Sequence, residues 1–420
     1  MTHTSTRTRH AARTLTLGVA LTLALAGAPP LASAAVQTTG QDGAAPAQEC
    51  AAPEVVAHRG SAGTSPENTV VSIRDARRSG AQSVEIDVQL SADGVPFLFH
   101  DATGARTTDV AQVYPDRAGD PIVDLTWAEL QQLDAGSYFA PRFAGEGIPH
   151  LNEAAKALAG GRTTVNIELK SPEDSPGVEE VLAQTLATDR HWQRLVARDK
   201  VVVSSFDEAS LTAFHELAPE IPVLQIGTIP ADDATLERWA GFADGVVTNY
   251  RTLDPADIER VRAVGLDLGL YTLNSPEAVE AAAALCVDEV TTDFPTQMVR
   301  LLRDQDPIPA ANGIEVSDVV DNPDGSDLQP ETGEHVVLTN TSSRTIDVSG
   351  YLLQDAVVNR LVVGEGYTLA PGAELRVYTG PGTDTADRYY NDLGRNVLNN
   401  TGDSVAVYTP QLRLMDLYAY

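Results

Sequence analysis

The sequence predicts an α/β fold, a (β/α)8 TIM barrel, followed by a small all-β sandwich. Three observations support this architecture. Between residues 54 and 300, eight short apolar runs alternate with segments of helical periodicity. Several of these runs end in charged or imidazole side chains. From residue 313 onward, the helical periodicity gives way to short β-rich runs separated by turn residues. A chain of 420 residues is also long for one domain, so two domains are expected.

Each strand expected in the barrel is a short apolar run. These runs lie at residues 54–58, 83–88, 164–169, 201–206, 222–226, 245–249, 267–273 and 288–293. Segments with helical spacing separate them, at 66–79, 152–159, 178–188, 208–217, 232–240, 255–264 and 276–285. Alternation of this kind over about 250 residues is typical of a (β/α)8 barrel. We therefore expect a barrel over residues 53–303, with its functional side chains at the C-terminal ends of the strands.

One apolar run does not fit the alternation. Residues 84–90 are followed by Ser91-Ala92-Asp93-Gly94 and then by a second run at 95–100. Asp-Gly between two apolar runs is a hairpin signal, whereas a parallel neighbour needs a longer crossover. We expect 95–100 to fold back on 84–90, with a turn centred near 92–93 that sets His100 opposite Glu85. Residues 101–150 then form an excursion over the top of the barrel, as a lid or specificity loop.

The C-terminal part of the chain has a different character. Residues 304–312 (Asp-Gln-Asp-Pro-Ile-Pro-Ala-Ala-Asn) are typical of a linker. Residues 313–420 contain only short strand-like runs and turns, which predicts an all-β sandwich. Its expected strands are 314–319, 335–340, 345–353, 367–369, 374–378, 389–390 and 404–409.

The N-terminus has the pattern of a secretory signal peptide over residues 1–34. Three arginines (Arg7, Arg9 and Arg13) precede an apolar stretch, and Ala32-Ser33-Ala34 fits a small-residue cleavage site. Residues 35–52 are expected to be a flexible lead-in. No later segment is long and apolar enough to span a bilayer. We therefore expect a secreted, extracellular protein that could associate with the cell wall.

The overall charge excludes some partners. The chain has 59 acidic and 29 basic residues, for a formal net charge of −30. Such a charge argues against nucleic acid or anionic lipid as the main partner.

The chain has only two cysteines, Cys50 and Cys286. In an exported protein such a pair is a disulfide candidate. Cys50 precedes the first expected strand and Cys286 the eighth, and these strands are neighbours in a closed barrel. We therefore predict a Cys50–Cys286 disulfide at the bottom of the barrel.

Candidate catalytic residues follow or end the apolar runs. Glu85, Asp87 and Glu168 could hold a hard divalent cation, and Glu85 and Asp87, two apart, share one face of a strand. His58 and His100 could transfer protons near neutral pH. Arg59 and Lys170 could hold an anion, and Phe206 and Tyr271 could line a pocket. An ion-pair network and core aromatics are the alternative interpretations. Glu67 and Asn68, after Pro66, are expected to cap a helix and position a loop.

These residues lie in motifs that together resemble the glycerophosphodiester phosphodiesterase family over residues 54–303. The motifs are His58-Arg59-Gly60, Pro66-Glu67-Asn68-Thr69, Glu85-x-Asp87, Asp93-Gly94, His100-Asp101, Arg106-Thr107-Thr108, Asn166-Ile167-Glu168-Leu169-Lys170, Ser204-Ser205-Phe206 and Val290-Thr291-Thr292-Asp293-Phe294-Pro295. The resemblance implies a metal-dependent barrel enzyme. It makes His58 and His100 the acid–base pair, Glu85, Asp87 and Glu168 the ligands of Ca²⁺ or Mg²⁺, and Arg59 and Lys170 the phosphate-binding residues.

The resemblance implies hydrolysis of glycerophosphodiesters to an alcohol and glycerol 3-phosphate. Tyr271 stands where the family often has Trp, which leaves the choice of alcohol open. Polymeric glycerol phosphate such as teichoic acid, or a lipid head group cleaved in the manner of phospholipase D, are alternative substrates. A non-catalytic surface-binding protein is a remote alternative. The sequence does not decide which histidine is the acid, or whether water or a neighbouring substrate hydroxyl attacks.

Residues 310–420 resemble the bacterial lamin-tail domain. The matching segments are 334–341, 348–351, 369–372, 375–380 and 399–403. This resemblance implies an immunoglobulin-like β-sandwich. We expect the domain to contact a cell-surface partner.

Overall fold

The structure is a computed structural model that describes residues 50–420. The predicted signal peptide (1–34) and nearly all of the predicted lead-in (35–52) lie outside the described residues.

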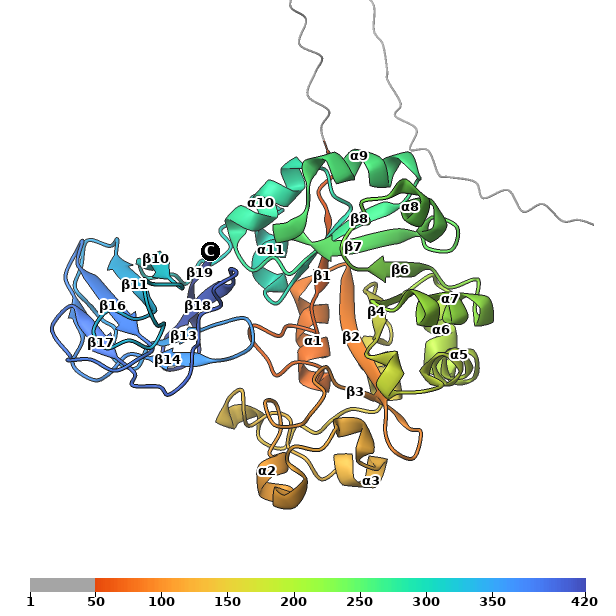
Figure 1. Cartoon of the computed structure of the whole chain (residues 1–420), viewed down its shortest axis with the longest axis horizontal. Coiled ribbons are helices and arrows are strands. Elements are labelled where there is room, and N and C mark those ends of the chain that lie inside the picture. Colours follow the sequence, from red (N-terminus) through yellow and green to blue (C-terminus); the bar gives the residue numbers. More distant parts are fainter. Residues whose placement is uncertain (1–49) are drawn as a thin grey trace, which may run out of the picture. The chain divides into compact units, whose positions relative to one another are not determined.

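Eight parallel strands form a closed barrel (Figure 1). Its strands are β1 (Glu54–Ala57), β2 (Ser83–Leu90), β4 (Thr164–Leu169), β5 (Val201–Ser205), β6 (Val223–Ile226), β7 (Gly245–Asn249), β8 (Asp267–Tyr271) and β9 (Glu289–Thr292). Each strand pairs with the next, and β1 pairs with both β2 and β9, which closes the ring. The predicted (β/α)8 barrel is therefore confirmed. Parallel pairing brings the C-terminal ends of all eight strands to one mouth.

Helices surround the barrel, as the sequence predicts. They are α1 (Val70–Ser79), α4 (Leu151–Leu158), α5 (Val178–Thr188), α6 (Arg190–Val196), α7 (Glu208–Leu217), α8 (Asp233–Trp239), α9 (Pro255–Ala263), α10 (Pro276–Ala284) and α11 (Pro295–Leu301). The short helices α6 and α11 are additional to those predicted. Helix α1 begins at Val70 rather than at residue 66, because Thr69 is its N-cap and accepts a hydrogen bond from the Ser72 amide.

The predicted hairpin exists, but its register differs from the expectation by one residue. Strand β3 (Pro96–Leu98) pairs antiparallel with β2 and sets Leu98 opposite Val88. A register with His100 opposite Glu85 would instead have set Leu98 opposite Asp87. The amide of Ser91 donates to the carbonyl of Val95, so the loop consists of the three residues between them. The last of these is Gly94, with φ +77°. Three-residue hairpin loops commonly have a left-handed glycine at that position.

The excursion after His100 has a small apolar core of its own. It contains α2 (Val110–Val113) and α3 (Trp127–Leu130), which Figure 1 shows grouped beside β3. Phe97, Ile122, Leu125 and Leu130 are among the residues buried in this cluster. The excursion is therefore a packed unit whose residues can hold fixed positions at the barrel mouth.

At the opposite end of the barrel, Glu289 is an acid with an unsatisfied oxygen. Its Oε1 is inaccessible to water and has no hydrogen-bond partner. Burial and the nearby charges of Glu54, Asp267 and Asp288 raise the pKa of Glu289 to about 7. The folded state therefore binds this proton more tightly than the unfolded state does.

Glu289→Gln is expected to stabilise the protein in a pH-dependent manner. The destabilisation by ionised Glu289 should develop as pH rises from the ordinary pKa of 4.5 to about 7. The variant's free energy of unfolding should therefore exceed that of the wild type by on the order of 2–3 kcal/mol above pH 7, and by little near pH 4. Urea unfolding at both pH values measures this difference. The exposed Glu280→Gln is the control, and an equal gain there would contradict the explanation.

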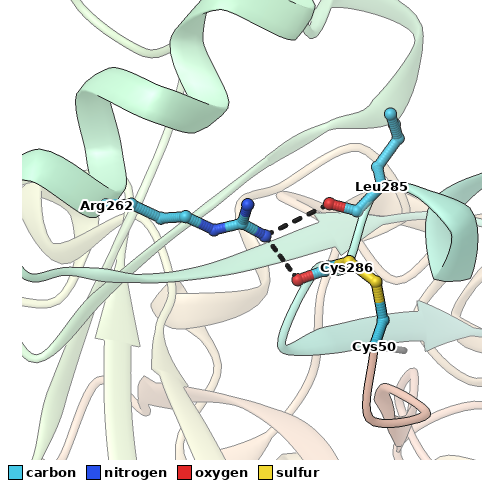
Figure 2. Close-up of a disulfide and its surroundings, with 4 residues drawn as sticks. All are labelled: Cys50, Arg262, Leu285 and Cys286. Carbon is cyan, nitrogen blue, oxygen red and sulfur yellow. Dashed lines mark hydrogen bonds between the residues drawn. A yellow bond between two sulfur atoms is a disulfide. The ribbon is translucent and has the colours of Figure 1, made fainter. Parts of the chain in front are cut away.

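A disulfide joins Cys50 to Cys286, with their Cα atoms 5.2 Å apart. Cys50 precedes β1, Cys286 precedes β9, and these two strands are paired. Figure 2 shows Arg262, whose guanidinium donates to the carbonyls of Leu285 and Cys286 at 3.1 and 2.6 Å. The bridge therefore links the chain ahead of β1 to the chain that leads into the neighbouring strand.

The C-terminal region is an all-β domain, as predicted. Its strands are β10 (Ile314–Val320), β11 (His335–Asn340), β12 (Ile346–Asp347), β13 (Leu352–Gln354), β14 (Arg360–Val362), β15 (Thr368–Leu369), β16 (Glu374–Tyr378), β17 (Arg388–Tyr390), β18 (Ser404–Tyr408) and β19 (Leu414–Ala419). Two four-stranded sheets, β10-β11-β16-β17 and β14-β13-β18-β19, contribute to one apolar core. The single strand expected at 345–353 is wrong: Gly350, with φ +70°, lies between β12 and β13, which pair with different strands.

Across residues 50–420, no helix combines the length and the apolar character that a membrane span requires.

Candidate active site

Three carboxylates meet at the mouth of the barrel. Glu85 and Asp87 lie on β2, and Glu168 on β4 is the parallel partner of Asp87. The three are buried, and one oxygen of each lies within 4.8 Å of the others. Because side chains two apart on a strand share a face, β2 presents both of its carboxylates to this cluster.

The protein's own cations do not fully satisfy this cluster. Burial and the charges of Asp87 and Glu168 raise the pKa of Glu85 well above its ordinary value. Burial and Asp87 also raise the pKa of Glu168. Oδ1 of Asp87 is buried without a hydrogen-bond partner, and Lys170 Nζ lies 3.9 Å from it. Repelling carboxylates with a buried oxygen that accepts no hydrogen bond are suited to a hard divalent cation.

His58, which follows β1, is held by the carboxylate of Asp293, which follows β9. Its Nδ1 lies 2.7 Å from Oδ1 of Asp293. An ionised carboxylate can only accept, so Nδ1 carries the proton, and a neutral His58 has Nε2 available as a proton acceptor. Asp293 is itself held by Asn274, whose Nδ2 donates to its Oδ2 at 2.6 Å.

His100 has a similar carboxylate partner. Its Nδ1 lies 2.8 Å from Oδ1 of Asp101, and Arg106 donates to both oxygens of Asp101 at 2.6 and 2.8 Å. Burial alone would raise the pKa of Asp101, but hydrogen bonds from Arg106 and His100 hold it well below its usual range. Asp101 therefore stays ionised and orients His100.

Glu67 connects the two halves of the site. Arg106 donates to both of its oxygens, at 2.6 and 2.8 Å, and Arg59 donates to Oε1 at 3.0 Å. Burial opposes ionisation of Glu67, but Arg59 and Arg106 lower its pKa to about 2. Glu67, Asp101 and His100 lie close enough together to hold a cation, but Arg106 pairs with both carboxylates. We therefore interpret this group as an ion-pair network rather than a second cation site.

Arg59 and Lys170 supply positive charge beside the carboxylates. The backbone N–H of Arg59, with φ +50°, donates to Oε2 of Glu85 at 2.6 Å. Lys170 Nζ donates to Oε1 of Glu168 at 2.9 Å. Burial disfavours the charge of Lys170, but Asp87 and Glu168 raise its pKa, so Lys170 stays protonated.

A cavity of about 220 Å³ brings these groups together. Its lining includes His58, Arg59, Glu85, His100, Glu168, Lys170, Phe206 and Tyr271, and Asp87 lies behind them in the carboxylate cluster. The rings of Phe206 and Tyr271 form an edge-to-face pair at 6.0 Å, and Phe206 is 52% exposed. All nine residues singled out from the sequence for this site therefore lie at one mouth.

The sequence analysis assigned no role to Asp293, Asn274 or Arg106. The helix-capping role expected for Glu67 and Asn68 is wrong, because Thr69 caps α1. Asn68 instead bonds with Asp87: its Nδ2 donates to Oδ2 at 2.7 Å, and its Oδ1 accepts from the Asp87 amide. Asp293 and Arg106 lie in motifs quoted above, but the histidine or carboxylate that each contacts lies in another motif, so local spacing did not assign their roles.

Fold and site together define a barrel enzyme with two oriented imidazoles beside a carboxylate cluster. The model of the glycerophosphoryl diester phosphodiesterase family matches residues 58–297, and the chain belongs to that family. The model of the lamin tail domain matches residues 307–420.

Relatives and solved structures agree with this assignment. Glycerophosphodiester phosphodiesterases from Bacillus subtilis and Caldanaerobacter subterraneus are 31% and 32% identical to the chain. The alignments cover 57% and 59% of this chain and 83% and 97% of theirs. A phosphodiesterase from Oleispira antarctica, solved with the product sn-glycerol-3-phosphate, is 33% identical, with a TM-score of 0.53. That alignment covers 60% of this chain and 97% of the other.

Proposed function

We propose that the protein hydrolyses glycerophosphodiesters to an alcohol and glycerol 3-phosphate, with Ca²⁺ or Mg²⁺ as cofactor. One observation carries this proposal. His58 and His100, each oriented by a carboxylate, line one cavity beside the cluster of Glu85, Asp87 and Glu168. The product bound by the Oleispira antarctica relative supports glycerol 3-phosphate as the released phosphate ester.

Glu85, Asp87 and Glu168 would hold the cation. Three carboxylates, one with a buried oxygen that accepts no hydrogen bond, are the oxygen donors that Ca²⁺ and Mg²⁺ prefer. Bound there, the cation would supply charge to stabilise negative phosphoryl oxygens. Arg59 and Lys170 line the same cavity and would bind the other phosphoryl oxygens.

His58 and His100 would act as the acid–base pair. One imidazole takes the proton of the attacking oxygen at Nε2, and the other donates a proton to the leaving alcohol oxygen. The attacking oxygen belongs to water, or to a neighbouring substrate hydroxyl whose cyclic phosphate product water then opens to glycerol 3-phosphate. Asp293 and Asp101 fix the two rings by their Nδ1 atoms, so that each Nε2 is available. Phe206 and Tyr271 would form an apolar wall against the organic part of the substrate.

The first test is a metal-dependent assay. Glycerophosphocholine should yield glycerol 3-phosphate, EDTA should abolish the release, and Ca²⁺ or Mg²⁺ should restore it. Glu168→Gln, which removes a negative oxygen donor, is expected to lower kcat by about 100-fold. The exposed Glu280→Gln should have no effect.

Release that survives both EDTA and Glu168→Gln would overturn the proposed cation site. Polymeric glycerol phosphate and a phospholipid, assayed in parallel, distinguish a small diester from a wall polymer or lipid substrate.

We also propose that the protein is exported and contacts the cell surface through its all-β domain. Support comes from the signal-peptide pattern and from the disulfide, which persists in oxidising compartments. Fractionation of cells into cytosol, wall and medium, with N-terminal sequencing, tests this. A cytosolic protein that retains Met1 would contradict export, and absence from the wall fraction would contradict surface contact.

A further inference from the structure

The barrel and the all-β domain share one apolar core. Ala406 and Tyr408 of β18, with Leu414 and Leu417 of β19, are buried in the same cluster as the barrel residues. On β18, Val405 and Val407 face the core of the all-β domain instead. Because side chains alternate along a strand, β18 is buried on both faces. The two domains are therefore packed together rather than only tethered.

One polar contact across this interface leads to His58. Asn274 Nδ2 has two hydrogens, and it donates to Oδ2 of Asp293 at 2.6 Å and to Oγ of Ser404 at 3.3 Å. Asn274, Asp293 and Ser404 are all buried. Without the Ser404 oxygen, one amide hydrogen of Asn274 would be buried without a partner, which is costly. Ser404 therefore helps to hold the amide that orients Asp293 against His58.

A second contact fixes the loop that follows His58. The hydroxyl of Tyr408 donates to the carbonyl of Gly63, and the Gly63 amide donates to the carbonyl of Asp293 at 2.9 Å. Tyr408 is 2% exposed. A Cβ at Gly63 would approach the ring of Phe294 to 2.4 Å, so the loop has no room to shift toward that side. Tyr408 therefore holds the His58 loop against the residue that orients His58.

A third contact leads toward His100. The guanidinium of Arg360 lies 5.3 Å from the centre of the Phe139 ring. The neighbouring Tyr138 hydroxyl accepts a hydrogen bond from the Glu67 amide at 3.1 Å. Glu67 in turn bonds with Arg106, which holds Asp101. The all-β domain thus contacts residues that support His58, and it also contacts Phe139, the chain neighbour of a residue in the network that supports His100.

We propose that the all-β domain is part of the catalytic apparatus, with Ser404 and Tyr408 as positioning residues for His58. This inference rests on the proposed function for its kinetic readout. It goes beyond a surface-binding role, because that role requires no buried contact with Asn274 or with the His58 loop.

The test uses the full-length chain with conservative variants. Ser404→Ala removes the acceptor for Asn274, and Tyr408→Phe removes the hydroxyl that bonds with Gly63. The matched control is Tyr367→Phe, which removes a tyrosine bond to the Arg388 carbonyl within the all-β domain. Each of the first two variants should lower kcat by roughly tenfold with little change in KM, whereas the control should leave kcat unchanged.

The Nδ1–H proton of His58 provides a readout that does not depend on substrate. This proton lies in the hydrogen bond to Asp293, so its NMR resonance should shift in Ser404→Ala, where Asn274 holds Asp293 less firmly. The control should leave that resonance unchanged. This measurement tests the inference even if the wild type fails to cleave glycerophosphocholine, which would count against the proposed function alone.

Two outcomes would overturn the inference. In the first, Ser404→Ala and Tyr408→Phe match the Tyr367→Phe control in kcat and in the His58 Nδ1–H resonance. In the second, kcat falls only in proportion to lost folded protein and the His58 Nδ1–H resonance does not shift, which indicates a merely structural contact. If Tyr408→Phe fails to fold, the smaller change Ser404→Ala alone tests whether the all-β domain positions His58.

Discussion

His58→Asn is expected to lower kcat for glycerophosphodiester hydrolysis by about 1,000-fold. The asparagine amide can replace Nδ1 of His58 as the donor to Asp293, so the local hydrogen bond should persist. It offers no group at the position of Nε2, so no proton can be transferred there. The loss should therefore appear in kcat, while KM changes little because Arg59 and Lys170, which we propose bind the phosphate, remain. Steady-state assays of glycerol 3-phosphate release measure both constants.

The same substitution at another histidine tests whether the fall in kcat is specific to His58. His215 lies on α7, outside the cavity, and His215→Asn should leave kcat unchanged. Asp293→Asn should also lower kcat strongly, since it preserves the shape but allows His58 to adopt the other tautomer. A His58→Asn variant that retains kcat within about threefold of the wild type would rule out proton transfer at this residue.

The carboxylate cluster can be predicted from the sequence, because its geometry follows from the period of a strand and from the parallel order of the barrel strands. Glu85 and Asp87 share a strand face by the two-residue period. Glu168 joins them because parallel strands end at the same mouth. The pairing of His58 with Asp293 spans 235 residues, so it depends on closure of the barrel and on side-chain rotamers. No local spacing encodes such a partner.

The hairpin register and the domain interface are two further features that sequence patterns did not predict. A three-residue loop differs from a two-residue loop by one residue, and that difference moves His100 relative to Glu85. In β18, alternation shows that both faces are apolar, but not that one of them faces the barrel. An interpretation of the sequence as two domains joined by a linker therefore does not predict the contact between Ser404 and Asn274.

Loss of the Cys50–Cys286 bridge is expected to lower the free energy of unfolding by about 2–5 kcal/mol. The bridge joins residues separated by 236 positions, so it removes many conformations from the unfolded chain. It also lies beside β1 and β9, the pair that closes the barrel. The double variant Cys50→Ala/Cys286→Ala should thus lose protection from hydrogen exchange first in these two strands. Urea unfolding and hydrogen exchange measure the two effects.

The wild type under reducing conditions is the internal control for this prediction. A reductant should lower the stability of the wild type to that of the double variant, and it should leave the double variant unchanged. Activity below the unfolding transition should persist in both, because the bridge lies at the end of the barrel opposite the catalytic mouth. A non-reducing peptide map without a Cys50–Cys286 linked peptide would contradict the bridge itself. A reductant-insensitive wild type would contradict its contribution to stability.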